Sequence, residues 1–204
     1  VCEGLTTTLT SGGAVAGTWT SADPAVAAAD PATGIISGVS AAVSGVNGVG
    51  QTRITYTLAT GCLRTQDFTV NPLPADISGI SNICENDMTV LGNGTPGGTW
   101  ISSNSGIATV NSFGVVTGVL SGNVVITYML STGCIKTWPM TVNANPDTIT
   151  GALQVCAGFA TNLHSGPAGG AWSSAPASNI YGTINTITGV VSGITAGLVP
   201  VTYT

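Results

Sequence analysis

Apolar and polar residues alternate along most of the chain, and this pattern predicts β-strands. Residues 52–58 and 124–130 both alternate and are rich in β-branched side chains, as in strands with one buried face. Residues 65–70 and 137–142 form a second matched pair, in which apolar side chains fall on one face two residues apart. We therefore expect at least two hairpins built from equivalent strands.

Turn residues separate these strands at short intervals, for example at 11–13, 93–98 and 165–167. No segment of ten or more residues has a helical period with capping residues. The Ala-rich stretch at 25–29 is short and lies between Pro24 and Pro31, which disfavours a helix. The sequence predicts an all-β fold of short strands and Gly-rich turns, typical of a β-sandwich.

The same elements recur three times in the same order: a Cys, a Gly-x-Trp, a Gly-x-x-x-Gly and a Thr-Tyr. The Cys, Trp and Tyr residues of the three copies are Cys2, Trp19 and Tyr56; Cys84, Trp100 and Tyr128; and Cys156, Trp172 and Tyr203. The first Cys residues of successive copies are 82 and 72 residues apart. This period is that of a small domain and is too long for a solenoid turn.

We therefore expect three modules, at 1–72, 73–144 and 145–204, joined by proline-containing linkers. The first copy starts at its Cys without the strand that precedes the Cys in the others, and the third stops before their Thr-Gly-Cys turn and last strand. These two modules are expected to be incomplete, as in a segment of a longer array. The first copy also carries about ten extra residues at 41–50, which predict a loop or hairpin extension.

The five cysteines follow the repeat. Cys2 and Cys62 hold matching places in the first copy, and Cys84 and Cys134 hold them in the second. Four cysteines allow three connectivities, but the repeat symmetry favours Cys2–Cys62 and Cys84–Cys134, with Cys156 unpaired within the chain. Loops of that length stabilise by about 4 kcal/mol each in the chain-entropy model. Disulfides indicate a place outside the reducing cytosol.

Charge is scarce. Only 5% of the residues are charged and the net charge is -5, so the surface must consist largely of small polar residues and Ala. The three cations form no basic patch, which argues against nucleic-acid binding. No apolar run is long enough to span a bilayer, and we expect no membrane insertion. A surface with so few charges tolerates close packing against another protein.

Residues with catalytic or metal-binding patterns are absent. The only histidine, His164, lies in a turn-rich stretch, and no Gly-x-Ser-x-Gly is present. Glu85 and Asp87 lack the spacing of a calcium loop, and no Cys-x-x-Cys or Cys/His cluster predicts a metal site. We expect no catalytic, cofactor-binding or metal-binding residue and no cofactor, and therefore no enzyme activity.

Three recurrent tryptophans allow two interpretations. Trp19, Trp100 and Trp172 could stack on sugars, but their fixed distance after each Cys favours core residues packed near a bridge. Trp138 does not recur, and we expect it to be partly exposed.

Several of these motifs carry a family resemblance. Gly-Val-Val-Thr-Gly-Val at 114–119 and Ile-Thr-Tyr at 126–128, with Trp-Ile-Ser-Ser-Asn at 100–104 before them, resemble bacterial immunoglobulin-like modules of group 2. The closing Thr-Gly-Cys and Thr-Val-Asn-Pro resemble the repeats of secreted surface proteins of Bacteroidetes-like bacteria. The resemblance implies a sandwich of about seven strands that serves as a spacer or contact module, and it implies no catalytic residue.

The leading functional prediction is a non-enzymatic structural protein, located outside the cell or on its surface. The chain would be a segment of a stalk, surface fibre or filament whose partners are further copies of itself or further repeats. One alternative is an adhesin segment that binds a glycan or a host protein, with residues 43–49 and Trp138 as the first candidates. Another is an accessory region of a larger secreted enzyme.

Overall fold

The computed structural model is all-β and describes residues 1–12, 16–42, 44–45 and 48–204. Val43, Val46 and Asn47 of the predicted extension lie outside the described residues. Contacts divide the chain into two compact units. Unit 1 comprises Val1–Val119 and Asn123–Val142, and unit 2 comprises Leu120–Gly122 and Asn143–Thr204. In the part of the chain that the structure describes, no helix is long and apolar enough to cross a membrane.

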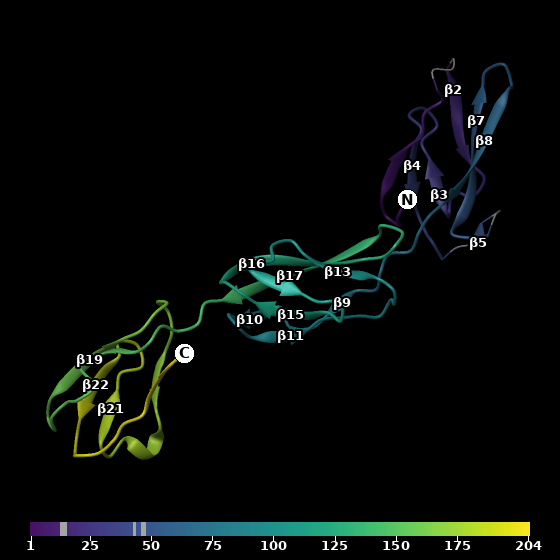
Figure 1. Ribbon diagram of the computed structural model, residues 1–204. Helices are drawn as coiled ribbons and strands as arrows, with labels where there is room; N and C mark the ends of the chain where they lie inside the picture. Colours follow the sequence, from purple (N-terminus) through teal and green to yellow (C-terminus); the bar gives the residue numbers. More distant parts are fainter. Residues whose placement is uncertain (13–15, 43, 46–47) are drawn as a thin grey trace. The chain divides into compact units, whose positions relative to one another are not determined.

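The first repeat of unit 1 is a sandwich of two antiparallel sheets (Figure 1). One sheet has the order β1-β4-β3, and the other has the order β2-β7-β8. A short β5–β6 hairpin precedes β7. The strands are β1 (Thr6–Thr8), β2 (Gly17–Ser21), β3 (Ala27–Ala29), β4 (Ile35–Gly38), β5 (Ser44–Gly45), β6 (Gly48–Val49), β7 (Gln51–Leu58) and β8 (Leu63–Thr69). Side chains from both sheets, including Ile36 of β4 and Ile54 of β7, form the core between them.

The second repeat of unit 1 has the same arrangement with one more strand in the larger sheet. Its sheets have the orders β10-β17-β16-β13 and β11-β15-β14, with a small β9–β12 pair beside them. The strands are β9 (Ile77–Ser78), β10 (Asn82–Cys84), β11 (Met88–Val90), β12 (Gly92–Asn93), β13 (Thr99–Ser102), β14 (Ala108–Val110), β15 (Val115–Gly118), β16 (Gly122–Met129) and β17 (Ile135–Asn143). The first strand expected for this module at 76–79 is β9, and β10, which ends at Cys84, follows it.

Unit 2 holds the third repeat, whose sheets have the orders β18-β19-β22-β21 and β20-β23. Its elements are β18 (Thr150–Gly151), β19 (Ala160–His164), β20 (Trp172–Ser174), the 3-10 helix η1 (Pro176–Ser178), β21 (Gly182–Ile184), β22 (Val190–Gly193) and β23 (Val201–Tyr203). β23 is the counterpart of β7 and β16, and in the described residues no strand like β8 or β17 pairs with it. A hollow of about 770 Å³ in this repeat is lined by side chains that include Leu163 of β19, Val191 of β22 and Val201 of β23.

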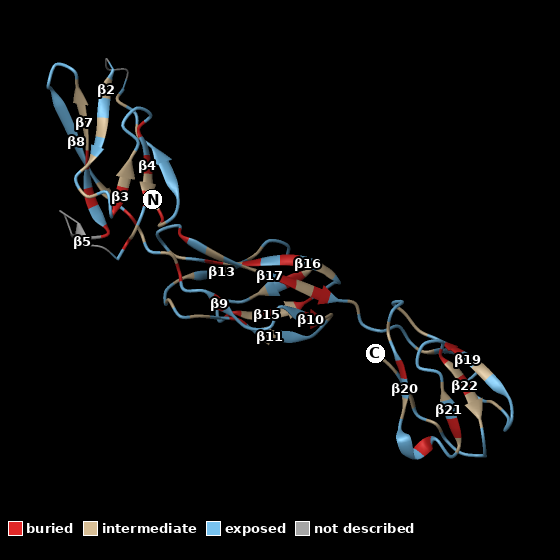
Figure 2. Cartoon of the chain, turned by 180° about the vertical axis from the view of Figure 1, so that it is seen from behind, coloured by how far each residue is buried: buried red, intermediate tan, exposed pale blue. Residues whose placement is uncertain are grey.

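Burial follows the alternation of the sequence, which is why these segments are strands. In β16, Val124, Ile126 and Tyr128 are buried, and the residues between them are more exposed (Figure 2). In β17, Met140 and Val142 share the buried face, as the matched pattern predicts. The prediction of an all-β fold of immunoglobulin-like sandwich modules is confirmed. The boundaries at 72/73 and 144/145 stay a prediction.

Each repeat contains the same Trp–Tyr contact between neighbouring strands. In the second repeat, Trp100 of β13 lies opposite Tyr128 of β16, with ring centroids 4.7 Å apart. The hydroxyl of Tyr128 donates to the carbonyl oxygen of Thr95 at 2.6 Å and accepts from the amide of Gly98 at 2.8 Å. The ring pairs of the first and third repeats are 4.6 and 4.8 Å apart. This contact, a ring pair with a satisfied hydroxyl, explains why Gly-x-Trp and Thr-Tyr recur together.

The first glycine of the Gly-x-x-x-Gly motif makes room for that tryptophan. Gly114 has φ +78°, and a Cβ at this position would lie 2.4 Å from the carbonyl oxygen of Leu91 and 3.1 Å from Nε1 of Trp100. The corresponding Gly34 and Gly189 have φ +72° and face equally close neighbours. Two constraints therefore favour glycine at this position: the positive φ and the lack of room for a Cβ atom.

Gly114→Ala should destabilise the second repeat more than Gly133→Ala. Gly133 also has a positive φ (+83°), but a Cβ there would meet nothing within 4 Å. Both variants carry a left-handed strain of about 1–2 kcal/mol, and the clash at Gly114 adds about 1–3 kcal/mol. Native-state hydrogen exchange of the β16 amides measures the difference. Equal losses of protection would contradict a packing role for this glycine.

Two surface ion pairs lie among the described residues, one between β7 and β8 and one between β17 and the residue just before β9. Nε of Arg53 lies 3.0 Å from Oδ1 of Asp67, and Nζ of Lys136 lies 2.8 Å from Oδ1 of Asp76. The hydrogen bond from Lys136, and then its charge, lower the pKa of Asp76. Because the Asp76 side chain is 89% exposed, solvent screens this pair and its contribution to stability is small.

Lys136→Met should raise the pKa of Asp76 toward its ordinary value. A lowered folded pKa means that the stabilisation is present above the ordinary pKa and is lost as the pH falls through the lowered one. Asp30 is the matched control, since hydrogen bonds from Thr33 and then Ala32 lower its pKa independently of Lys136. An NMR titration of the two carboxyl groups checks this. A shift at both residues, or at neither, would contradict the assigned cause.

Candidate functional site

The described residues bring no metal-binding cluster together. No group of three His, Cys, Asp or Glu side chains among them could hold a metal ion. His164 is exposed at the end of β19. The cysteines are therefore the side chains whose placement carries chemical information.

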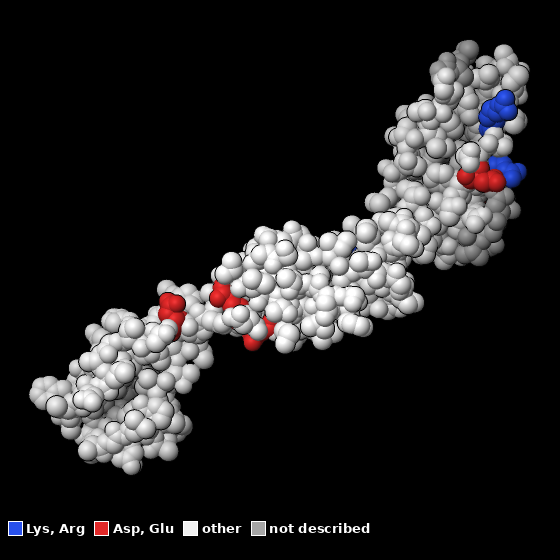
Figure 3. Space-filling model, viewed as in Figure 1, with Lys and Arg blue, Asp and Glu red and all other residues white. Residues whose placement is uncertain are grey.

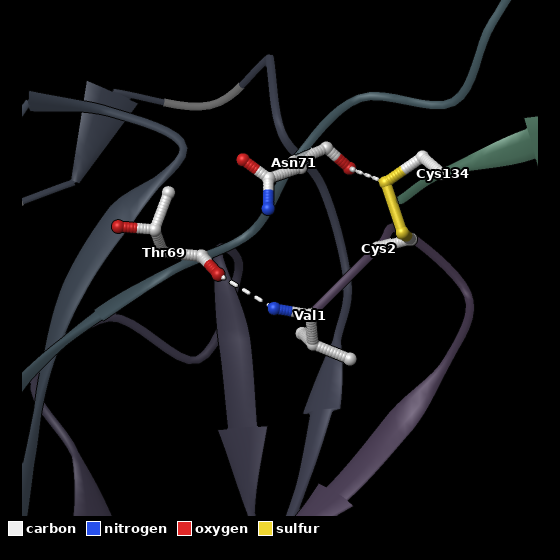
Figure 4. The surroundings of a disulfide bond; sticks show 5 residues. All are labelled: Val1, Cys2, Thr69, Asn71 and Cys134. Carbon is white, nitrogen blue, oxygen red and sulfur yellow. Dashed lines mark hydrogen bonds between the residues drawn. A yellow bond between two sulfur atoms is a disulfide. The ribbon is translucent and has the colours of Figure 1, made fainter. Parts of the chain in front are cut away.

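A disulfide joins Cys2 of the first repeat to Cys134 of the second (Figure 4). The two Cα atoms are 5.6 Å apart, and 132 residues separate them in sequence. Cys2 immediately precedes the first repeat's strands, and Cys134 lies in the turn between β16 and β17. The bond therefore ties two successive repeats together and encloses the linker between them.

Backbone hydrogen bonds hold Cys2 at the end of its repeat. Cys2 pairs with Asn71 in a parallel bridge, and the amino group of Val1 donates to the carbonyl oxygen of Thr69 at 3.0 Å. Sγ of Cys134 lies 3.9 Å from the carbonyl oxygen of Asn71, a contact only, because a disulfide sulfur carries no proton. Cys2 is 8% exposed and Cys134 is 1% exposed. The junction thus shields its own sulfur atoms.

This bond corrects the expected pairings Cys2–Cys62 and Cys84–Cys134. Cys2 lies beside Asn71, which follows β8, while Cys62 precedes β8. Asn71 is nine positions after Cys62 along an extended chain, a distance of about 30 Å at the rise of a β-strand, whereas bonded cysteines have Cα atoms within about 7 Å. The pairing inside the first repeat is therefore impossible.

The second repeat excludes its internal pairing in the same way. β10, which ends at Cys84, pairs with β17, and the amide of Thr141 near the end of β17 donates to the carbonyl oxygen of Ser81. Cys134 lies at the other end of β17. Cys62, Cys84 and Cys156 are free thiols, of which Cys62 and Cys156 are exposed and Cys84 is half-buried. The sequence places only the turn cysteine beside the long strand, and the pairing of the leading cysteine with the far end of that strand is visible only in the structure.

The predicted core tryptophans pack against their own repeats. Trp172 is buried, and Trp19 and Trp100 are half-buried against the apolar clusters of their repeats. Trp138 packs partly against the second repeat's cluster, and its buried Nε1 has no hydrogen-bond partner among the described residues. The adhesin alternative based on Trp138 and residues 43–49 stays a prediction, as does the accessory role in a secreted enzyme.

No family model matches the chain, and no curated protein matches it. Among solved structures, it is similar to domains 4 and 5 of the S-layer protein SbsC, with 19% identity, TM-score 0.26, and coverage of 65% of this chain and 74% of that one. It is also similar to a C-terminal intimin fragment in complex with the intimin-binding domain of its translocated receptor. The identity is 15% and the TM-score 0.40, and the match covers 74% of this chain and 61% of that one. A third similar structure is that of extracellular domains 3–5 of Drosophila OTK, with 10% identity, TM-score 0.33, and coverage of 96% of this chain and 84% of that one.

The chain spans less than two thirds of the intimin fragment. At these TM-scores the likenesses carry no functional argument, and the fold assignment rests on the strands and sheets of the chain itself.

Trypsin distinguishes the observed disulfide from the expected ones. Cleavage after Arg53, Arg64 and Lys136 places Cys2 on 1–53, Cys62 on 54–64, Cys84 and Cys134 on 65–136, and Cys156 on 137–204. Non-reducing digestion followed by mass spectrometry should link 1–53 to 65–136 and leave 54–64 unlinked. Cys84→Ser should keep this link and Cys134→Ser should abolish it. A link between 1–53 and 54–64 would overturn the structural pairing.

Proposed function

We propose that this chain is a non-enzymatic structural segment of an extracellular stalk, surface fibre or filament, in which disulfides connect one repeat to the next. The observation that carries the proposal is the bond between Cys2 and Cys134, which crosses a repeat boundary. A staple that only stabilised a small core would lie within one repeat. A bond across the boundary acts on the connection between modules.

The bond changes how the chain carries tension. A force applied at the two ends passes through Cys2 and the sulfur atoms to Cys134, and it bypasses residues 3–133. The linker at 71–74 and the body of the first repeat then bear no load. This arrangement suits a protein whose task is to hold its ends together under pull.

The surface supports packing against other proteins. Figure 3 shows a face on which charged side chains are few and scattered, in keeping with a charged fraction of 5%. Several large apolar side chains are exposed, among them Met88 and Val90 on β11 and Phe113 in the turn before β15. Little charge repulsion opposes contact with a neighbour, and exposed apolar area favours it. We therefore place the protein outside the cell, with like modules as its partners.

Force spectroscopy of the full chain, pulled from both ends, tests this role. Without reductant, residues 3–133 should stay shielded, and reduction should release them as about 470 Å of additional contour length. Cys2→Ser should give the full length without reductant. Cys84→Ser, which leaves the bond intact, should behave like the unmodified chain. Equal lengths before and after reduction would contradict a load-bearing role for the bond.

A further inference from the structure

The three free thiols occupy the same two kinds of position as the bonded pair. Cys2, Cys84 and Cys156 share one, which we call the leading position, and Cys62 and Cys134 share the other, the turn position. The bond in the structure joins a leading cysteine to the turn cysteine of the following repeat. This order defines a direction along the array.

The backbone around the leading cysteines is the same in all three repeats. The carbonyl oxygens of Cys2, Cys84 and Cys156 each accept a hydrogen bond of 3.1 Å from the amide three residues on. The amides two residues after these cysteines donate to Gly38, Gly118 and Gly193, respectively, at 2.9 to 3.0 Å. The same two backbone hydrogen bonds therefore hold the main chain at each leading cysteine.

The turn cysteines are equally alike. The carbonyl oxygen of Cys62 accepts from the amide of Leu58 at 2.8 Å, and that of Cys134 accepts from Leu130 at 2.9 Å. The glycines before them have φ +88° and +83°. The two turn cysteines differ in solvent exposure, since Cys134 is 1% exposed at the junction with Cys2 while Cys62 is exposed. Cys62 is therefore an exposed turn cysteine, and the leading cysteine that could bond to it must lie in another repeat.

We propose that Cys156 of one copy and Cys62 of the next form a second disulfide of the same kind, which links copies head to tail. The proposal deepens the structural role given above and rests on it. The leading cysteine of the third repeat of one copy then bonds to the turn cysteine of the first repeat of another copy, in the same order as Cys2–Cys134. Cys84 is not assigned to this bond because it is half-buried, whereas Cys62 and Cys156 are exposed.

Bond formation requires an oxidant, which we assign to a low-molecular-weight disulfide such as oxidised glutathione. A thiolate attacks the glutathione disulfide and releases one reduced glutathione, and the second protein thiolate displaces the other. Two thiols thus lose two electrons and two protons, and one glutathione disulfide becomes two reduced molecules. Because no linker holds the copies together, the reaction should need a protein concentration near the effective concentration of a tether, about 1 mM.

The test uses the full chain at about 1 mM in a glutathione redox buffer. Non-reducing electrophoresis should show a ladder in steps of 20.1 kDa that collapses on reduction. Tryptic mapping of the ladder should link 54–64 to 137–204. Cys62→Ser and Cys156→Ser should each abolish the ladder, and Cys84→Ser should preserve it. Both thiols are exposed, so these substitutions leave the cores intact.

Three outcomes would overturn the proposal: a chain that stays monomeric while its 1–53 to 65–136 link is formed, a ladder that survives Cys156→Ser, or peptide 54–64 linked to itself. None of them affects the force measurement, which reports only on Cys2–Cys134. Failure of the copy-to-copy bond can therefore be told apart from failure of the structural role.

Discussion

The length of one strand governs where the cysteines of this protein can bond. A turn cysteine lies just before each of the long strands β8 and β17, and the backbone that pairs with the leading cysteine's segment lies at the other end, at Asn71 after β8 and at Thr141 in β17. An extended backbone cannot shorten, so the two ends stay about 30 Å apart. A leading cysteine can reach a turn cysteine only in another module, and the disulfide must connect repeats.

The same geometry leaves each small core to stabilise itself without a covalent staple. In every repeat a tryptophan packs against a tyrosine on the neighbouring strand, and a glycine in the left-handed region leaves space for the indole ring. The tyrosine hydroxyl is satisfied by backbone groups in the second and third repeats. This recurrent contact accounts for most of the motif by which the repeats are recognised.

The proposed structural role rests on the surface and the junction together. Exposed apolar side chains and scarce charge favour contact with neighbours. A disulfide at the boundary makes the connection between repeats covalent twice, through the linker and through sulfur. Such a double connection resists pulling better than a single linker does.

The sequence by itself determined the strands, the buried faces and the register of the repeats. The apolar alternation of β16 and β17 extends over a few residues, and the Trp–Tyr–Gly motif acts between adjacent strands. Such local patterns can be recognised from the sequence alone. Only the tertiary structure decided which cysteines pair. That choice depends on which end of a sandwich each thiol occupies, and Cys2 and Cys134 meet across 132 residues of chain. Repeat symmetry groups equivalent cysteines but cannot tell a bond within a repeat from a bond to the next, because both obey the same period.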